Sequence, residues 1–363
     1  MGIFRLNKKK IKNNIDSLLK LLFPINRSIT GQGNRETLNI IKEIIPINIH
    51  EVPSGSQAFD WLVPKEWKVN KAYLKEKNGK EIVNFLNNNL HLVNYSIPIN
   101  KTLTYDELVP HIHTLKNQPN AIPYRTTYYN DNWGFCMAHN DYLNLDRNKL
   151  YEVFIDTELK NGNLTYADYY VHGKSKKEFM FSTYFCHPSM ANDNLSGLIT
   201  QSIIASELSK IKPYHSYRFV FVPETIGAIV YCKKNYDKLK KLEGGFILSN
   251  VGGPGNFSYK QSYNKNHYLN EIIKIAFDKL NIKYKTFPFD IHGSDERQYS
   301  SNGLRLNMPS VHKDKYYEYN EYHTSEDNLD FVKSEFLMES LNIYEKIIEI
   351  LEKNKIFKNK VEA

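Results

Sequence analysis

The second half of the chain contains three short runs that are apolar almost from end to end. They lie at 179–185, 217–222 and 245–250. Strands of this kind are buried on both faces, which is typical of the parallel strands of α/β proteins. Apolar residues at helical spacing follow at 195–208, 269–280 and 331–351. This alternation predicts an α/β fold, a three-layer α/β/α sandwich around a mixed sheet.

The segment 59–170 has a different texture from the rest of the chain. Helical spacing at 10–23 and 35–44 and a strand pattern at 47–52 assign residues 1–58 to the same sandwich as 171–363. Within 59–170 aromatic residues are frequent, and short alternating runs are separated by Asn, Gly and Pro, with one helical turn near 106–115. These features predict an inserted, smaller β-rich subdomain over 59–170.

Composition excludes several classes of protein. With 41% hydrophobic residues the 363-residue chain can bury a core. Three cysteines, none in a C-x-x-C pattern, exclude a disulfide scaffold. The N-terminus lacks a signal-like apolar stretch and no apolar run reaches 18 residues, so we expect a cytoplasmic protein without a membrane span.

The net charge of +8 also fits a nucleic-acid groove, but the lysines are scattered. An AT-rich codon bias and solvated faces explain the charge better, and no nucleic-acid partner is expected.

Imidazole and carboxylate side chains gather where the predicted strands end. His187 and Asp193 follow the first run, Glu224 follows the second, and His323 lies in a later polar loop. Ligands of open α/β sheets bind beyond the carboxyl ends of the strands, so these side chains should share one crevice. A catalytic zinc has three protein ligands and an open position for water. His187, Asp193 and His323 form such a set, and Glu224 remains as a general base towards the bound water.

Each of these residues also has a simpler explanation. His187 could be an ordinary loop histidine, and Asp193 could cap the helix that begins near residue 195. Glu224 could be a salt-bridge partner, and His323 could be exposed. Their common position at strand and loop ends of one sheet favours the metal site, because all the simpler explanations would have to coincide.

Four motifs contain these residues. They are His187-Pro-x4-Asp193-Asn-x-Ser-Gly, Pro223-Glu224-Thr-x-Gly, Gly293-Ser-Asp-Glu-Arg-Gln-Tyr299 and Tyr322-His323-Thr-Ser-x-Asp327. Together they resemble a bacterial aminopeptidase-like family whose genes are often found with surface-polysaccharide biosynthesis genes. The small domain inserted in that family is resembled by the segments Phe59-Asp-Trp61…Pro64-x-x-Trp67, Asn94-Tyr-Ser96, Ile122-Pro-Tyr124 and Trp133-Gly-Phe-Cys136. The resemblance covers nearly the whole chain and implies a zinc-exopeptidase-like fold, distantly similar to leucyl aminopeptidases and glutaminyl cyclases.

Two positions depart from the di-zinc aminopeptidases of that wider group. Those enzymes have two consecutive glutamates, and Thr225 stands at the second position here. They also have an aspartate ligand at the end of the next strand, where this chain has Ser249-Asn250. The resemblance therefore implies one zinc per chain, with the three remaining ligands and Glu224 as base. It also puts ordinary aminopeptidase activity in doubt.

The leading interpretation is a zinc-dependent amide hydrolase that acts on a small molecule, a peptide or an amino-sugar amide. Asp295, Arg297 and Tyr299 are predicted to orient the substrate, since Arg297 would suit a carboxylate through paired hydrogen bonds. A structural ion-pair network is the alternative for these three residues. Two other functions stay open: acyl transfer or cyclisation at the same zinc, and a non-catalytic binding domain that has kept the fold.

Overall fold

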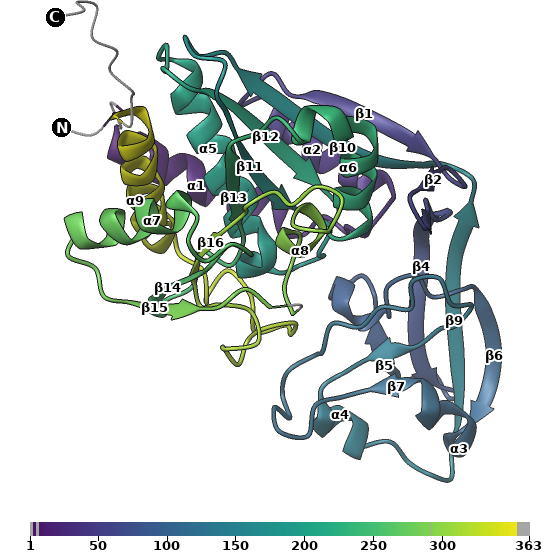
Figure 1. Cartoon of the computed structure of the whole chain (residues 1–363). Coiled ribbons are helices and arrows are strands. Elements are labelled where there is room, and N and C mark those ends of the chain that lie inside the picture. Colours follow the sequence, from purple (N-terminus) through teal and green to yellow (C-terminus); the bar gives the residue numbers. More distant parts are fainter. Residues whose placement is uncertain (1–2, 5–6, 291, 354–363) are drawn as a thin grey trace, which may run out of the picture.

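The structure is a computed structural model that describes residues 3–4, 7–290 and 292–353. Its largest element is an eight-stranded mixed sheet (Figure 1). In spatial order the strands are β1 (Asn48–Pro53), β10 (Asn163–Val171), β12 (Ser216–Val222), β11 (Glu178–Tyr184), β13 (Gly244–Leu248), β16 (Ser310–Lys313), β14 (Phe257–Lys260) and β15 (Tyr284–Phe287). The central strands β12, β11, β13 and β16 are parallel, whereas β1, β10 and β14 join through antiparallel pairs.

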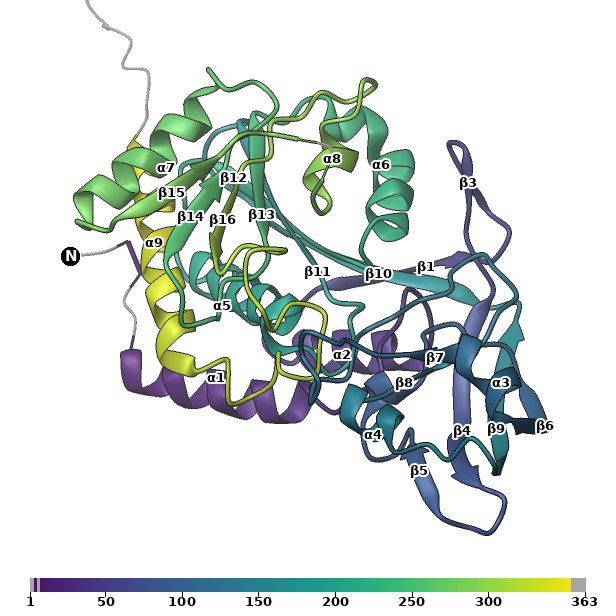
Figure 2. The ribbon, with the colours of Figure 1, turned by 90° about the horizontal axis from the view of Figure 1, so that it is seen from below.

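Helices cover both faces of this sheet (Figure 2). One core combines the sheet with α1 (Lys8–Leu22), α2 (Gln32–Lys42), α5 (Gly197–Ser209), α7 (Tyr268–Lys279) and α9 (Ser334–Lys353). On the other face, α6 (Ile226–Leu239) and the short α8 (Glu296–Tyr299) contribute to a second core. Phe179 and Phe181 belong to the first core and Met180 to the second, because successive side chains of a strand point to opposite faces. The predicted three-layer α/β/α sandwich with a mixed sheet is confirmed.

The helices with a regular apolar stripe lie close to their predicted positions. In α1 the buried residues Ile11, Ile15, Leu19 and Leu22 recur every three or four positions. By contrast, α6 was not predicted, because every residue from Ile226 to Cys232 is buried and the first half of the helix has no polar face. In the part of the chain that the structure describes, no helix is long and apolar enough to cross a bilayer.

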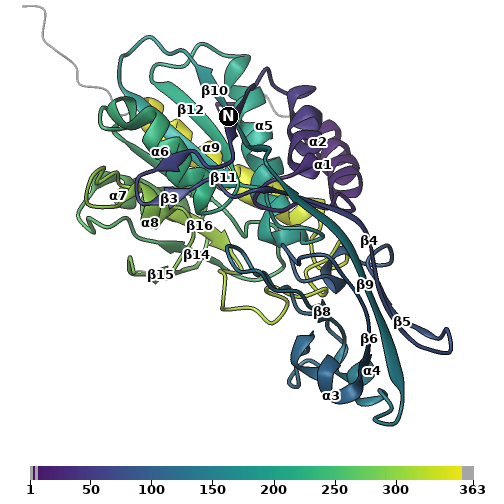
Figure 3. The same cartoon turned by 90° about the vertical axis from the view of Figure 1, so that its right-hand side faces the viewer.

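A second, four-stranded antiparallel sheet stands beside the sandwich (Figures 1 and 3). Its strands are β5 (Glu81–Asn84), β4 (Glu66–Glu76), β9 (Leu150–Lys160) and β6 (Ile99–Thr104). Shorter elements accompany it: β2 (Gln57–Ala58), β3 (Trp61–Leu62), η1 (Asn89–His91), α3 (Tyr105–Leu108), η2 (Val109–His111), β7 (Ile112–His113), β8 (Phe135–Cys136) and α4 (His139–Leu143). We call the segment 59–162 the insert.

The strand pairing near the end of the insert favours an earlier boundary than residue 170. The predicted subdomain reaches residue 170, yet β10 pairs with β1 and β12 in the large sheet. Only residues 161–162 separate β9 from β10, so the strand texture continues across the change of sheet. The division into domains stays a prediction, and this pairing favours a boundary near 162.

An ion pair joins the insert to the sandwich where β4 begins. The carboxylate of Glu66 accepts hydrogen bonds from the Arg35 guanidinium on α2 and from the backbone N–H of Asn163, the latter at 3.1 Å. Burial would raise the pKa of Glu66, but the bonds from Arg35 and Asn163 outweigh it and lower this pKa below its ordinary value. This pair therefore stabilises the junction while Glu66 is ionised.

Candidate metal centre

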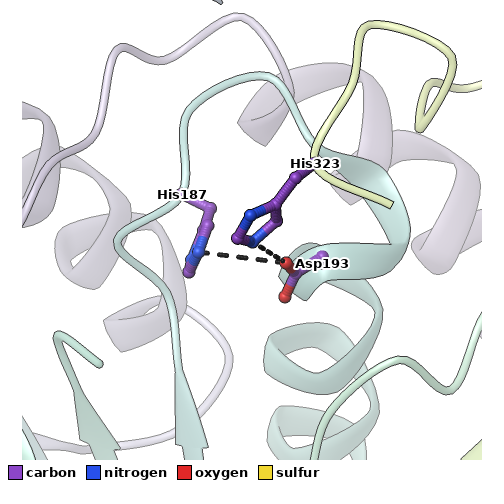
Figure 4. Close-up of side chains that lie close together, drawn as sticks. All are labelled: His187, Asp193 and His323. Atoms are coloured by element: carbon purple, nitrogen blue, oxygen red, sulfur yellow. Dashed lines mark ion pairs between the residues drawn. The ribbon is translucent and has the colours of Figure 1, made fainter. Parts of the chain in front are cut away.

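The structure brings His187, Asp193 and His323 together beyond the carboxyl end of β11 (Figure 4). His187 follows β11, Asp193 lies in the π-helical turn η3 (Ala191–Ser196) before α5, and His323 lies in the loop between β16 and α9. One ligand atom from each residue lies within 4.8 Å of the others. The Oδ2 atom of Asp193 is 3.0 Å from Nε2 of His323 and 3.8 Å from Nε2 of His187.

These atoms fit a zinc ion. Ligands bound to a tetrahedral zinc at about 2.0–2.1 Å lie roughly 3.3 Å apart, near the two distances above. Asp193 Oδ2 and His323 Nε2 are buried and lack a hydrogen-bond partner of adequate geometry among the described residues. Buried polar atoms are nearly always paired, and a cation would supply the missing partner.

The protonation states also suit a metal. Burial lowers the pKa of the His187 imidazole to about 4. Burial would raise the pKa of Asp193, but His187 and His323 beside it lower that pKa to about 2. At neutral pH His187 is therefore a neutral imidazole and Asp193 a carboxylate, which are the forms that bind zinc.

Two buried residues outside the predicted set hold Asp193 in place. The hydroxyl of Tyr184 donates to Asp193 Oδ1 at 2.5 Å. The carboxylate of Asp327 accepts from the backbone N–H of Asn192 at 2.6 Å and of Asp193 at 2.9 Å. Both have weak signals in the sequence: Asp327 ends the motif that contains His323, and Tyr184 is a polar-tipped residue in an apolar strand.

The two imidazoles are positioned through backbone atoms. Arg27, buried between α1 and α2, donates from Nε to the carbonyl of His187 at 3.1 Å. The backbone N–H of Tyr124, in the insert, donates to the carbonyl of His323 at 2.8 Å. The ring of Tyr124 lies 5.2 Å from each imidazole ring, centroid to centroid. The sequence alone did not single out Arg27, and it singled out Tyr124 only as part of the Ile122-Pro-Tyr124 segment, without a role at the site.

Glu224 lies beside the three ligand residues. It follows β12 by two positions, and its Oε2 is 3.7 Å from Nε2 of His187. Its backbone N–H donates to the sulfur of Cys186 at 3.2 Å, and 27% of its side chain is exposed. Burial and the charge of Asp193 raise the pKa of Glu224 to about 7. A carboxylate in this position can accept a proton from a nearby water.

Thr225 and Asn250 stand at the positions where di-zinc enzymes have further carboxylates, and both make other hydrogen bonds. The backbone N–H of Thr225 donates to Asp295 at 2.8 Å, and its hydroxyl accepts from Arg297 at 3.4 Å. The side-chain amide of Asn250 donates to the hydroxyl of Tyr319 at 3.0 Å. Neither side chain offers a carboxylate to a second metal ion.

Two of the residues predicted to orient the substrate, Asp295 and Arg297, contact Thr225. Asp295 is fully buried, and burial raises its pKa well above the ordinary value, with the nearby Glu224 adding to this. Tyr299 is also buried, and its hydroxyl lies 2.9 Å from that of Ser182 on β11. Arg297 is exposed. These contacts favour the structural alternative for Asp295 and Tyr299, and the substrate role of the three stays a prediction.

A pocket of about 410 Å³ adjoins the ligand residues. On the sandwich side its lining includes His187, Glu224 and His323. On the insert side it is lined by Trp61, Tyr124, Thr126, Thr127, Tyr128, Tyr129 and Asn130. The insert therefore forms one wall of the pocket, as expected if it overhangs the site.

Comparison with known proteins gives concordant results. The family described as a domain of unknown function, DUF4910, matches residues 16–354. A Clostridium acetobutylicum protein, named as a candidate polysaccharide biosynthesis protein with an aminopeptidase-like domain, is 42% identical over 353 residues, which are 97% of this chain and 81% of that protein.

Two solved structures share the fold. The crystal structure of a candidate peptidase from Clostridium acetobutylicum has a TM-score of 0.94 and 42% identity, and the match covers 98% of this chain and 85% of the other. A zinc aminopeptidase from Bacillus subtilis has a TM-score of 0.71 at 15% identity, with 97% and 96% covered. At that identity the second likeness concerns the fold alone, and it confirms the aminopeptidase-like architecture.

Proposed function

Since the chain belongs to the DUF4910 family and has an aminopeptidase-like fold, we propose that it is a zinc-dependent amide hydrolase with one zinc per chain. The observation that carries this proposal is the convergence of His187, Asp193 and His323 on one point, with Glu224 3.7 Å from His187 at the head of a pocket. The name of the Clostridium relative supports a role in surface-glycan metabolism.

The chemistry divides between the metal ligands and Glu224. A bound zinc would lower the pKa of a coordinated water towards ~7 and polarise the amide carbonyl. Glu224 accepts a proton from the water while the water oxygen forms a bond to the acyl carbon of the amide. The same proton then passes from Glu224 to the amide nitrogen as the C–N bond breaks, which leaves a carboxylic acid and an amine.

A single zinc is supported by the side chains at the two departing positions. Neither Thr225 nor Asn250 has a carboxylate; the Thr225 hydroxyl accepts from Arg297, and the Asn250 amide N–H donates to Tyr319. Elemental analysis of the purified protein should give one equivalent of zinc, and it should fall towards zero in His187→Ala. Two equivalents, or zinc retained fully in that variant, would contradict the assignment.

Substitution of Glu224 tests the hydrolytic function. Glu224→Gln is nearly isosteric but cannot accept the proton of the water, while Glu224 is not among the three grouped ligand residues. Since general-base catalysis contributes roughly 10²–10⁴-fold, turnover on a panel of peptides and N-acyl amino sugars should fall by that factor, or by about 3–5 kcal/mol of barrier.

Zinc content and melting temperature measured on the same Glu224→Gln sample serve as controls and should stay close to the wild-type values. Unchanged turnover with a lowered melting temperature would reject the catalytic role. In that case a binding domain that has kept the fold would be the better description.

A further inference from the structure

The insert wall of the pocket differs in chemistry from the sandwich wall. Its residues Trp61, Tyr124, Thr126, Thr127, Tyr128, Tyr129 and Asn130 offer aromatic rings, hydroxyl groups and one amide. None of them is charged at neutral pH. We propose that this wall is a binding subsite for an uncharged N-acyl sugar ring, so that the scissile amide belongs to an N-acylated amino sugar and not to the free N-terminus of a peptide. This inference rests on the proposed hydrolase function.

The charges around the site disfavour a free ammonium group beside the scissile bond. Among the described residues that line the pocket, Glu224 is the one acid, and it is needed as the base. Asp193 lies between the two imidazoles and Tyr184, and Asp295 is buried and bonded to the backbone of Thr225. An ammonium that is desolvated without a carboxylate partner is strongly disfavoured, whereas an N-acyl group carries no charge.

Two exposed aromatic rings stand on the insert wall in a fixed arrangement. Trp61 and Tyr129 are 38% and 50% exposed, and their ring centroids are 5.6 Å apart at an angle of 68°. The Tyr129 hydroxyl donates to the carbonyl of Leu62 at 2.8 Å, which joins segment 126–130 to the β2–β3 hairpin. An aromatic face is electron-rich, and it attracts the weakly positive C–H groups on one face of a pyranose ring.

The polar groups of the wall match the other edges of a sugar. Thr126 and Asn130 are exposed on the same segment as Tyr129. The Asn130 amide N–H donates to the carbonyl of Tyr128 at 3.3 Å, and its Oδ1 and the Thr126 hydroxyl can bond to ring hydroxyls. A pocket built to hydrogen-bond hydroxyl groups rejects a ligand that lacks them, such as an aliphatic amino-acid side chain. The volume of about 410 Å³ lies at the small end of ligand pockets, about 300–1,000 Å³, and suits one ring with its N-acyl arm.

Trp61 supplies a direct optical test. The chain has three tryptophans, and the other two, Trp67 and Trp133, are only 3% and 8% exposed. The zinc-loaded Glu224→Gln protein should be titrated with N-acetylglucosamine and, as comparisons, with glucosamine and leucinamide, which both carry an ammonium group. We expect a saturable change in fluorescence with N-acetylglucosamine, and an affinity at least tenfold higher than for either amine. Trp61→Phe should abolish the signal.

A negative charge introduced into the insert wall should reverse the preference for the N-acyl sugar over the ammonium ligand. Asn130→Asp should lower the affinity for N-acetylglucosamine about tenfold and raise the affinity for leucinamide about tenfold. Asn132→Asp is the matched control, because it adds the same charge outside the pocket lining and keeps the oxygen that accepts from the backbone N–H of Trp133. It should leave both affinities unchanged.

Binding is measured without turnover, so a failure of the sugar subsite can be distinguished from a failure of the hydrolase proposal. Leucinamide that binds as tightly as N-acetylglucosamine, or an Asn130→Asp variant that behaves like Asn132→Asp, would overturn the sugar subsite. Selective sugar binding with unchanged turnover in Glu224→Gln would reject the hydrolase and keep the subsite.

Discussion

Replacement of Tyr184 by Phe removes one hydroxyl from the metal centre and leaves the ring in place. That hydroxyl donates to Asp193 Oδ1 at 2.5 Å, and the two residues are 2% and 1% exposed. A buried hydrogen bond to a charged acceptor contributes about 1.5–3 kcal/mol, so the free energy of unfolding of the metal-free protein should fall by that amount. Zinc affinity should also fall, roughly 10–100-fold, because the carboxylate loses the group that orients it.

The assay for Tyr184→Phe combines urea unfolding of the metal-free protein with zinc competition against a chromogenic chelator. Tyr217→Phe is the matched control. Tyr217 is buried at the opposite end of β12 and donates to a carboxylate oxygen of Glu352 at 2.8 Å. The Tyr217→Phe variant should lose about as much free energy of unfolding as Tyr184→Phe and keep the zinc affinity of the wild type. Equal zinc affinity in the Tyr184 variant and wild type would refute the reasoning, because Asp193 would then be oriented without this bond or would not bind the metal.

Three further substitutions or treatments have defined outcomes. Removal of zinc with EDTA should lower the melting temperature of the wild type but not of His187→Ala; a site saturated a thousandfold above its Kd adds about 4 kcal/mol to the free energy of unfolding. Asp327→Asn should weaken zinc binding in the competition assay, because one of the two oxygens that accept from the backbone near Asp193 becomes a donor. Arg35→Met should lower the free energy of unfolding by about 1–3 kcal/mol at pH 7. Because the folded pKa of Glu66 is lowered, this difference should be present above the unfolded pKa of about 4.3 and vanish as the pH falls through the folded pKa, which urea melts at pH 7 and pH 3 can check.

The sequence could place His187 and Glu224 near each other because one rule of α/β folds applies to both. His187 and Glu224 follow strands that are buried on both faces, and such strands are recognisable from composition alone. Once β11 and β12 are parallel neighbours, their carboxyl ends meet at one edge and the two side chains must approach each other. The position of His323 was a weaker inference, because it lies in a loop with no strand directly before it.

Elements without a regular pattern could not be predicted in this way. The short strands β16, β14 and β15, which lie together on one side of the large sheet, have four residues each, too few to show a period. The supporting residues were hidden for a different reason. Tyr184 and Asp327 meet at Asp193 although 143 positions separate them in the chain, and only the folded structure relates the two.

The contact between the insert and the candidate metal centre also could not be predicted from the sequence, because it is made by backbone atoms. The N–H of Tyr124 bonds to the carbonyl of His323, and the N–H of Ser325 bonds to the carbonyl of Ile122 at 2.9 Å. These bonds pair one strand-like segment of the insert with the loop that contains His323, and they can form with many different side chains. The wall that we assign to the sugar and the loop that positions His323 are therefore parts of one hydrogen-bonded unit. Because the two share these bonds, we expect zinc binding and ligand binding to change each other's affinity by the same factor.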